Sequence, residues 1–256
     1  MLTFISCAKT MTSKSQVVTG TSVSYPAFQQ QANQHALELG SMSAEDLGRL
    51  LHVNSKLAAE NALRYHDFFS ESNLPLPSIL SYTGMVFKRI DAAHFTPDDF
   101  KYAQEHLLIS SFLYGLLKPM DLIKNYRLEG NVKLGKNEGE TMFTYWKPIL
   151  TDFFIQSIKK QGGILINLAS EEMKNLFDWK KVCKEVRVIT PEFYTIKNGK
   201  LTAVTVYAKM CRGEMTRFII KNRMDHPDDL KGFEWEGFIY DANRSSADEF
   251  FFVLEA

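Results

Sequence analysis

The sequence predicts a single α+β domain over residues 1–256, built on a mixed β-sheet with surrounding helices. Its length of 256 residues suits one large domain, and its 45% hydrophobic content is ample for one core. Segments with strand and helix patterns follow one another without strict β-α-β alternation, which favours an α+β arrangement. The 30 basic and 30 acidic residues give a net charge of 0. This balance argues against a protein that coats nucleic acid over its whole surface, but it is compatible with a local basic site.

The first third of the chain predicts a strand, a loop, a helix and a second strand. Residues 2–6 form a short apolar run typical of a strand, and residues 11–25 are rich in Ser, Thr and Val, which indicates a long loop. Leucines recur at helical spacing in residues 43–69, so a helix is expected there. The largely apolar residues 78–87 are interpreted as a strand.

A strong helix start follows at Thr96. Pro97 occupies the first helical position, and the two acids after it lie at the positive end of the helix dipole. The apolar face of this helix is predicted to continue to Tyr114. Gly115 and Pro119 are then expected to end this helix and to begin another.

Two further helices and, besides a hairpin, three further strands are predicted beyond residue 140. Residues 143–160 and 210–223 have helical patterns, and residues 164–168 form a short buried strand. Residues 238–240 and 250–254 are interpreted as two late strands that pair with each other.

The dipeptide Asn198-Gly199 predicts the turn of a β-hairpin. It lies between the β-prone residues 186–196 and 201–208. Asn-Gly between two such runs is the strongest short-range hairpin signal, because both residues tolerate the positive φ of a tight turn.

Charge is uneven along the last third of the chain. Residues 178–223 carry a net charge of +7, and residues 224–256 carry a net charge of −7. This asymmetry indicates either an anionic ligand near the basic segment, or two segments that lie together and neutralise each other.

The cysteines favour a reduced, cytoplasmic protein. Cys7, Cys183 and Cys211 are far apart and odd in number, and there is no Cys-x-x-Cys motif. No stretch approaches the roughly 18 apolar residues of a membrane span, so no membrane partner is expected. The sequence has no P-loop or Gly-x-Gly-x-x-Gly motif, and its 6 histidines show no metal-ligand spacing. Neither a cofactor nor a metal is therefore predicted.

Five sequence blocks, taken together, resemble the YaaA peroxide-stress protein family. They are Ser6-Cys7-Ala8-Lys9-Thr10, residues 55–64, residues 113–129, Asn167-Leu168-Ala169-Ser170 and residues 207–217. The chain departs from the family pattern at Cys7, where the family has proline, and at Met85, where the family has an acidic residue. The resemblance implies a cytoplasmic bacterial protein that limits oxidative damage by lowering available iron. It also implies one compact domain with a helix-hairpin-helix element, a basic cleft and affinity for DNA.

The expected place of the helix-hairpin-helix is the turn at Gly115. Such an element needs a tight turn between apolar anchors, so that backbone amides and the next helix N-terminus can meet a phosphate. Gly115, its apolar flanks and Lys118 fit this description. An ordinary turn between two helices, with glycine at the end of one and proline at the start of the next, fits the same residues.

The matched blocks supply the predicted DNA- and phosphate-binding residues. These are Lys9, Thr10, Lys56, Arg64, Tyr114, Gly115, Lys118, Arg127, Asn167, Lys209, Arg212 and Arg217. If the blocks converge, they form a positive pocket suited to phosphate or nucleotide recognition, with point charges from lysine and bidentate contacts from arginine. For Lys56 and Arg64 a simpler interpretation is open, since both have i,i+4 spacing to Glu60 and can form a solvated ion-pair face.

Three hypotheses about function follow. The first is a DNA-binding stress protein without sequence preference. The second is an enzyme acting on a nucleotide or nucleobase in the same pocket, with Lys9 or Lys209 as a reactive lysine of lowered pKa and Asp121 as an orienting or acid/base group. The third is an iron-sequestering protein, which the scattered His and Cys residues do not favour. Asp121 also has a structural interpretation, because an acid at the start of a helix stabilises its dipole.

Overall fold

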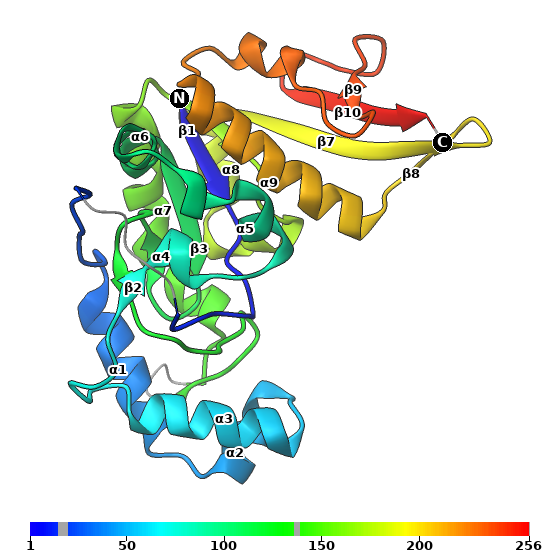
Figure 1. The fold of residues 1–256 in the computed structure, drawn as a ribbon. Coiled ribbons are helices and arrows are strands. Elements are labelled where there is room, and N and C mark those ends of the chain that lie inside the picture. The colour runs from blue at the N-terminus through cyan, green and yellow to red at the C-terminus, as the bar shows by residue number, and fades with distance from the viewer. Residues whose placement is uncertain (15–19, 136–138, 256) are drawn as a thin grey trace.

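The computed structural model describes residues 1–14, 20–135 and 139–255 (Figure 1). Its strands are β1 (Leu2–Ile5), β2 (Leu76–Pro77), β3 (Leu107–Ser111), β4 (Gly115–Leu117), β5 (Leu122–Ile123), β6 (Ile164–Asn167), β7 (Arg187–Lys197), β8 (Lys200–Thr202), β9 (Ile239–Tyr240) and β10 (Glu249–Glu255). Its α-helices are α1 (Gln29–Gly40), α2 (Ala44–Leu51), α3 (Ser55–His66), α4 (Ser78–Ser81), α5 (Met85–Ile90), α6 (Pro97–His106), α7 (Met142–Lys160), α8 (Trp179–Glu185) and α9 (Thr205–Asn222). Short 3₁₀ helices are η1 (Ala92–His94), η3 (Glu171–Leu176) and η4 (Pro227–Gly232).

A mixed sheet runs through the molecule. Its order within the described residues is β4-β3-β1-β6-β7-β10-β9, with β8 paired to β7. The strands β3, β1, β6, β7 and β10 are parallel to their neighbours in this row, whereas β4, β8 and β9 add antiparallel pairs. The predicted mixed sheet with surrounding helices is therefore confirmed.

The chain changes direction across the sheet at β1. From β1 it passes to β3 on one side, and after β4 it crosses to β6 on the other side of β1. In parallel sheets, such a change of side leaves a crevice between the carboxyl ends of the two strands concerned. The structure thus marks the ends of β1 and β6 as the place for a site.

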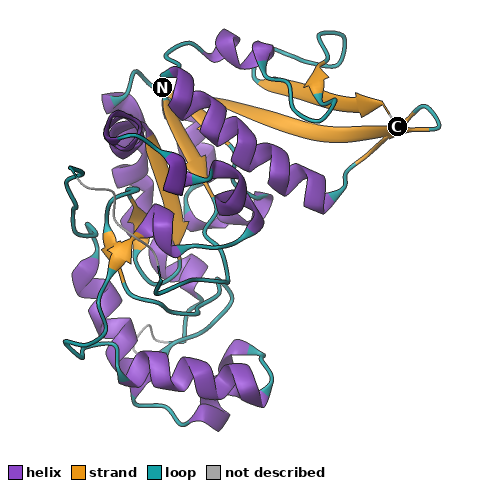
Figure 2. Ribbon diagram, viewed as in Figure 1, coloured by secondary structure: helices purple, strands orange, loops and turns teal. Residues whose placement is uncertain are grey.

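Helices cover both faces of the sheet (Figures 1 and 2). The helices α6 and α9 pack on one face, and α7 and α8 pack on the other. Phe4 of β1 contacts two rings of the second layer edge-on, with centroid distances of 5.0 Å to Phe154 and 5.6 Å to Phe177. Trp146 of α7 is fully buried, and its Nε1 donates a hydrogen bond to the Phe112 carbonyl at 2.8 Å. The core therefore lies directly beneath the loops that follow β1 and β3.

Several local signals predicted their elements correctly. Thr96 and Asp99 form a capping box at the start of α6, and the Asn198-Gly199 turn joins β7 to β8. The second strand of this hairpin is shorter than predicted, because residues 205–208 belong to α9. The predicted late strands pair as β9 and β10. In the predicted loop 11–25, residues 15–19 lie outside the described part of the chain.

The two oppositely charged segments lie together. The parallel pairing of β10 with β7 brings them side by side, and Arg187 Nε lies 2.8 Å from the Asp248 carboxylate. Mutual neutralisation therefore accounts for part of the charge asymmetry in the sequence.

Residues 78–87 do not form the predicted strand. They form α4 and the start of α5, and an extended stretch at Tyr82–Gly84 separates the two helices. Ile79 and Leu80 are both buried, and a short run that is buried all round cannot be assigned to helix or strand from its periodicity.

The predicted helix-hairpin-helix at Gly115 is wrong, and so is the alternative turn between two helices. The helix α6 ends at His106, and the apolar residues after it form β3, which pairs with β4 in an antiparallel manner. Gly115, with φ of +74°, begins β4. The run Leu107–Ser111 is buried along its whole length, so its apolar side chains indicated a core segment and not a helical face.

A helical hairpin lies instead at α2 and α3. The predicted helix over 43–69 is interrupted at His52, which adopts the left-handed conformation with φ of +52°. Asn54 then begins α3, and its side chain accepts a hydrogen bond from the Leu57 amide at 3.0 Å. The helices approach closely at Gly48, where an added Cβ would lie 3.1 Å from the Ala58 methyl.

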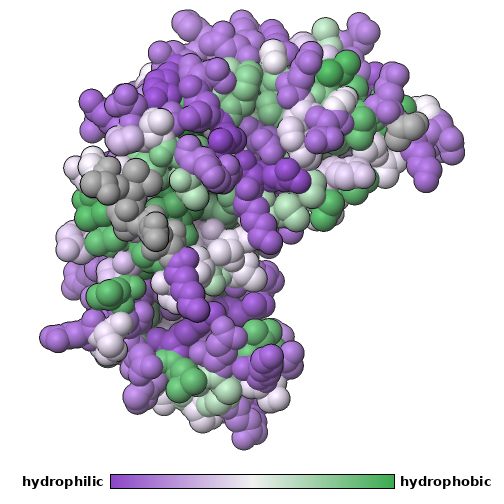
Figure 3. All heavy atoms as spheres, in the orientation of Figure 1, coloured by the Kyte–Doolittle hydropathy of each residue, from purple (hydrophilic) through white to green (hydrophobic). Residues whose placement is uncertain are grey.

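The molecule has a curved outline with two ends. One end carries α9 and the strands β7–β10, and the other carries the α2–α3 hairpin (Figure 1). The space-filling view shows a hollow between these ends (Figure 3). Within the described residues, no helix is long and apolar enough to cross a membrane.

Candidate functional site

A cavity of about 540 Å³ lies at the carboxyl ends of β1 and β6, where the chain changes side of the sheet. This volume lies within the roughly 300–1,000 Å³ typical of small-molecule sites. Its wall is made by residues 6–10, 84–87, 126–131 and 168–173 together with Phe112, Phe143, Lys209 and Arg212, although Ala169 and Glu171 are not part of it. These elements border the hollow seen in Figure 3.

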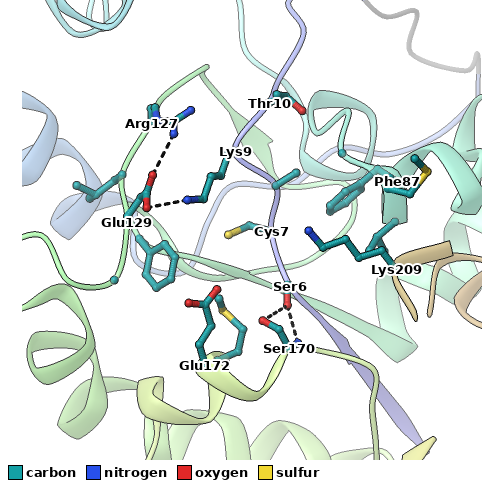
Figure 4. A pocket seen from close by; sticks show the side chains of 18 of the residues that line it. Ser6, Cys7, Lys9, Thr10, Phe87, Arg127, Glu129, Ser170, Glu172 and Lys209 are labelled. Atoms are coloured by element: carbon teal, nitrogen blue, oxygen red, sulfur yellow. Dashed lines mark hydrogen bonds and ion pairs between the residues drawn. The ribbon is translucent and has the colours of Figure 1, made fainter. Parts of the chain in front are cut away.

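Two serines join the ends of β1 and β6 at the floor of the cavity (Figure 4). The Ser170 amide donates a hydrogen bond to Ser6 Oγ at 2.9 Å, and the two hydroxyl oxygens are 3.2 Å apart. Each serine follows a short buried strand, so the sheet holds both hydroxyls in place. The segment after Ser6 also needs a glycine opposite it, because a Cβ on Gly84 would lie 2.6 Å from the Ala8 methyl.

Apolar and aromatic side chains make up much of the wall. Phe87, Phe112, Phe143 and Met173 line the cavity. Phe112 and Phe143 contact each other edge-on, with ring centroids 5.3 Å apart. Such a surface suits a flat, apolar ligand group.

A chain of buried hydroxyl groups supports the wall at Tyr126. Its hydroxyl oxygen lies 2.7 Å from that of Tyr82 and 2.8 Å from Ser111 Oγ. Burial raises the pKa of both tyrosines well above the usual range, so both stay neutral. These three hydroxyl groups act as a structural support, because they hydrogen-bond to one another.

One cluster of charges at the cavity rim is held by ion pairs among its own members (Figure 4). Glu129 accepts hydrogen bonds from Lys9 Nζ at 2.8 Å and from Arg127 Nη2 at 3.1 Å. The Lys9 side chain is 65% exposed, whereas that of Arg127 is 17% exposed. The reactive-lysine hypothesis requires a desolvated lysine, and the exposed, ion-paired Lys9 does not meet that requirement.

A second pair of cations comes from α9. Lys209 and Arg212 are three residues apart and therefore share one side of the helix. Lys209 reaches into the cavity between Ser6 and Phe87 (Figure 4). Neither side chain makes a hydrogen bond or ion pair within the part of the chain that the structure describes. These two positive charges are thus available to a ligand.

Arg212 is the more deeply placed of the two. Its Nε is buried and has no hydrogen-bond partner among the described residues. Burial lowers the pKa of Arg212, while the carboxylates of Glu192 and Glu171 act in the opposite direction from beyond ion-pair distance. A guanidinium group in this position gains stability from any anion that enters the cavity.

An acid faces these cations from the opposite side of the cavity. Glu172 points towards Cys7 and lies close enough to raise the pKa of its thiol. It forms no ion pair within the described residues. The cavity therefore offers a carboxylate acceptor as well as two cations.

Cys7 lies in the middle of the cavity wall. Its amide donates a hydrogen bond to Ser110 Oγ at 3.1 Å. Burial, more than the nearby Glu172, raises the pKa of its thiol to about 11. The thiolate is the reactive form of cysteine, so this thiol is expected to be unreactive near neutral pH.

Alkylation of the folded protein with iodoacetamide at pH 8 tests this expectation. Cys7 should react roughly 100-fold more slowly than in the urea-unfolded chain, where a cysteine has an ordinary pKa of about 8.5. Mass spectrometry of peptides gives the rate at each cysteine, and the exposed Cys183 is the internal control. Equal rates at Cys7 in the folded and unfolded chains would contradict the proposed burial.

The predicted site residues converge only in part. Five of them line the cavity: Lys9, Thr10, Arg127, Lys209 and Arg212. The other predicted binding residues and Asp121 are not part of its wall: Lys56, Arg64, Tyr114, Gly115, Lys118, Asn167 and Arg217.

Four of the outlying residues have structural partners. Tyr114 accepts a hydrogen bond from the Lys124 amide at 3.0 Å, and Asn167 accepts one from the Ala169 amide at 3.3 Å. Arg217 donates to the carbonyls of Ile90 and Asp91 at the end of α5, at 2.8 and 3.0 Å. Arg64 pairs with Glu60, as the solvated ion-pair interpretation predicted.

Asp121 is also part of the framework. No helix begins at Pro119, so the predicted dipole interaction does not exist. The carboxylate accepts hydrogen bonds from Ser24 Oγ at 2.6 Å and from the Lys118 amide at 2.8 Å. Burial raises the pKa of Asp121. It supports the turn after β4 and lies outside the cavity wall.

The sequence prediction missed the acids and the aromatic wall. Glu129 lies in the matched block 113–129 but was not predicted as a site residue, and Glu172 belongs to no matched block. Phe112 and Phe143 have the pattern of ordinary core residues. The usable signal was the position of Ser6 directly after one short apolar strand and of Ser170 three residues after another, because ligand sites collect at strand ends. Among the described residues, no group of three or more His, Cys, Asp or Glu side chains could hold a metal ion.

Comparison with known proteins identifies the class of protein that carries this fold and site. A family model described as "Peroxide stress protein YaaA" matches residues 1–244. A UPF0246 protein from Phocaeicola vulgatus is 62% identical over 254 residues, which cover 99% of each chain. UPF0246 proteins from Bacteroides fragilis and Porphyromonas gingivalis are 54% and 44% identical, over 99% and 100% of this chain and 98% and 100% of their own. The chain belongs to the YaaA peroxide stress protein family.

Proposed function

We propose that the protein acts in the response to peroxide by binding duplex DNA in the hollow between its two ends, without sequence preference. Membership of the peroxide stress family supports the stress role. The cytoplasm is the proposed location, and its cysteines, which form no disulfide within the described residues, are in keeping with it. The lowered free iron implied by the family resemblance is proposed as a cellular consequence of this role.

The observation that carries the proposal is the presence of cations at both ends of the hollow. At one end, Lys209 and Arg212 of α9 have no ion-pair partner within the described residues. At the other end lies the α2–α3 hairpin, where Lys56 is exposed in the first turn of α3. Backbone amides at a helix start and a nearby lysine can together contact a phosphate without reading any base. The α2–α3 hairpin is therefore the proposed place of the phosphate contacts that were expected at Gly115.

Salt titration of DNA binding tests the proposal. Each phosphate contact contributes about 0.9 to the slope of log affinity against log salt on duplex DNA. Lys56→Ala and Lys209→Ala are each expected to lower this slope by roughly 1 and to weaken binding to all sequences alike. Fluorescence anisotropy with two labelled duplexes of different sequence measures both effects.

Lys118→Ala is the matched control. Lys118 is an exposed lysine beside the small β2–β5 sheet, and it lies outside both the cavity wall and the hairpin. Its variant should keep the parental slope. If Lys56→Ala and Lys209→Ala both keep the parental slope while circular dichroism confirms their fold, DNA does not bind in this hollow.

The cavity favours a second candidate, an enzyme that acts on a nucleotide or nucleobase. The observation that favours this candidate is the position of the cavity at the carboxyl ends of β1 and β6, where the chain crosses from one side of the sheet to the other. Small ligands bind at this position in many α/β proteins. Lys209 is the lysine that reaches into the cavity, so it is the candidate nucleophile of this second proposal, although it is exposed like Lys9. Lys209→Arg distinguishes the two proposals, because it keeps the positive charge for DNA but removes the nucleophilic amine.

A further inference from the structure

We propose that the cavity is a binding site for one nucleotide, a nucleoside monophosphate unit whose phosphate is held by Lys209 and Arg212. This goes beyond the binding of a duplex in the hollow, because it concerns one cavity with a defined occupant. It deepens the second candidate by naming the chemical class of the ligand.

The charge of the cation pair favours a phosphate. A phosphate monoester carries about −1.5 to −2 charges at pH 7, whereas a carboxylate carries only −1. Lys209 and Arg212 present two positive charges without ion-pair partners in the described chain. The planar guanidinium adds bidentate geometry for two phosphate oxygens, and the ammonium adds a point charge.

The buried Nε of Arg212 makes an anion especially favourable there. A buried donor without a partner destabilises a protein by about 1–3 kcal/mol, and more when the group is charged. Glu192 and Glu171 lie beyond ion-pair distance, so they compensate this charge only in part. A phosphate in the cavity would satisfy the donor and the charge together.

The remaining wall suits a base and sugar. Phe87, Phe112 and Phe143 provide aromatic surface for a flat ring. Glu172 and Ser6 provide acceptors for ring N–H, amino or hydroxyl groups. The cavity of about 540 Å³ is large enough for a single nucleotide.

Isothermal titration calorimetry with the four ribonucleoside 5′-monophosphates tests the inference. At least one should bind with a dissociation constant below about 1 mM, a free energy of about −4 kcal/mol. The matching nucleoside and inorganic phosphate should each bind at least tenfold more weakly, because each lacks half of the contacts. The bound nucleotide should also raise the melting temperature.

Arg212→Met is the decisive variant, since it removes the charge but keeps a long side chain. It should weaken nucleotide binding at least tenfold and abolish the rise in melting temperature. Arg49→Met is the matched control, because Arg49 pairs with Glu45 and Asp46 on α2 and lies outside the cavity wall. No binding of any of the four nucleotides at 5 mM, or equal binding by Arg212→Met and the parent, would overturn the inference.

A nucleotide can be free or can form the end of a DNA strand. Competition with a duplex that carries a 5′-phosphorylated overhang, compared with the same duplex without that phosphate, distinguishes these sources. Displacement by the phosphorylated overhang alone assigns the site to strand ends, and displacement by neither duplex assigns it to free nucleotides. Lys56→Ala should leave nucleotide binding unchanged, because Lys56 lies outside the cavity wall. A result that contradicts the DNA proposal can therefore be told apart from one that contradicts the nucleotide site.

Discussion

Gly213→Ala is expected to lower the free energy of unfolding by about 2 kcal/mol, although alanine is the better helix former by about 1 kcal/mol. Gly213 lies in the middle of α9, where α5 crosses at close range. A Cβ at this position would lie 2.4 Å from the Val86 carbonyl oxygen and 2.6 Å from Arg89 Cβ. The first neighbour is backbone, so it cannot move aside without shifting α5. Steric overlap should therefore outweigh helix propensity.

Urea denaturation followed by circular dichroism measures this effect. Gly232→Ala is the control, because an added Cβ there has no neighbour within 4 Å among the described atoms and φ is not positive. Its stability should stay within about 0.5 kcal/mol of the parent. A Gly213→Ala variant more stable than the parent would show that α5 and α9 are not packed as closely as described. The result matters for the cavity, because α5 and α9 form two of its walls.

Asp99→Asn is expected to destabilise the protein by about 3 kcal/mol at pH 7. Asp99 is 2% exposed, and its carboxylate lies 2.7 Å from Lys221 Nζ and 2.9 Å from Arg223 Nη1. It also accepts the Thr96 amide at the start of α6. These ion pairs link α6 to the end of α9. Substitution by asparagine leaves both cations without their buried counter-charge.

The same group predicts a dependence of stability on pH. Burial alone would raise the pKa of Asp99, but hydrogen bonds from Lys221, Thr96 and Arg223 lower it well below its ordinary value of 3.8. Its stabilising contribution is therefore complete above the unfolded pKa and is lost as the pH falls through the folded one. The difference in stability between the parent and Asp99→Asn should be constant from pH 7 to pH 5 and should shrink below about pH 4.

Asp98→Asn is the control for this prediction. Asp98 is the exposed neighbour in the same first turn, so its removal loses only about 0.5 kcal/mol of interaction with the helix dipole. Equal losses in the two variants, or a difference between the parent and Asp99→Asn that is as large at pH 2 as at pH 7, would assign the ion cluster a negligible role.

Elements with their own local chemistry could be predicted from the sequence. The Thr96 capping box and the Asn198-Gly199 turn depend on residues within a few positions of each other. The strand Leu107–Ser111 could not be predicted in this way. Its apolar pattern fits a helix equally well, and pairing with β1, about a hundred residues away, decides the outcome.

The site was predictable only as a collection of cations. The blocks around Lys9, Arg127, Lys209 and Arg212 do converge on one cavity. Which of these cations are ion-paired could not be predicted. Glu129 pairs with the first two, whereas the second two have no ion-pair partner in the described chain. That difference depends on how the loops after β1 and β5 meet, and no local sequence pattern records it.

The central position of β1 has a consequence for folding during synthesis. β1 is made before both of its neighbours, which begin only at Leu107 and Ile164. At about 5–20 residues per second, β1 waits roughly 8 to 32 s on the ribosome before β6 has been made. Unpaired apolar strands tend to aggregate, and the length of only 4 residues limits the edge that β1 exposes in that time. The strand β1 is thus paired on both sides only after a further stretch of about two thirds of the sequence has been made.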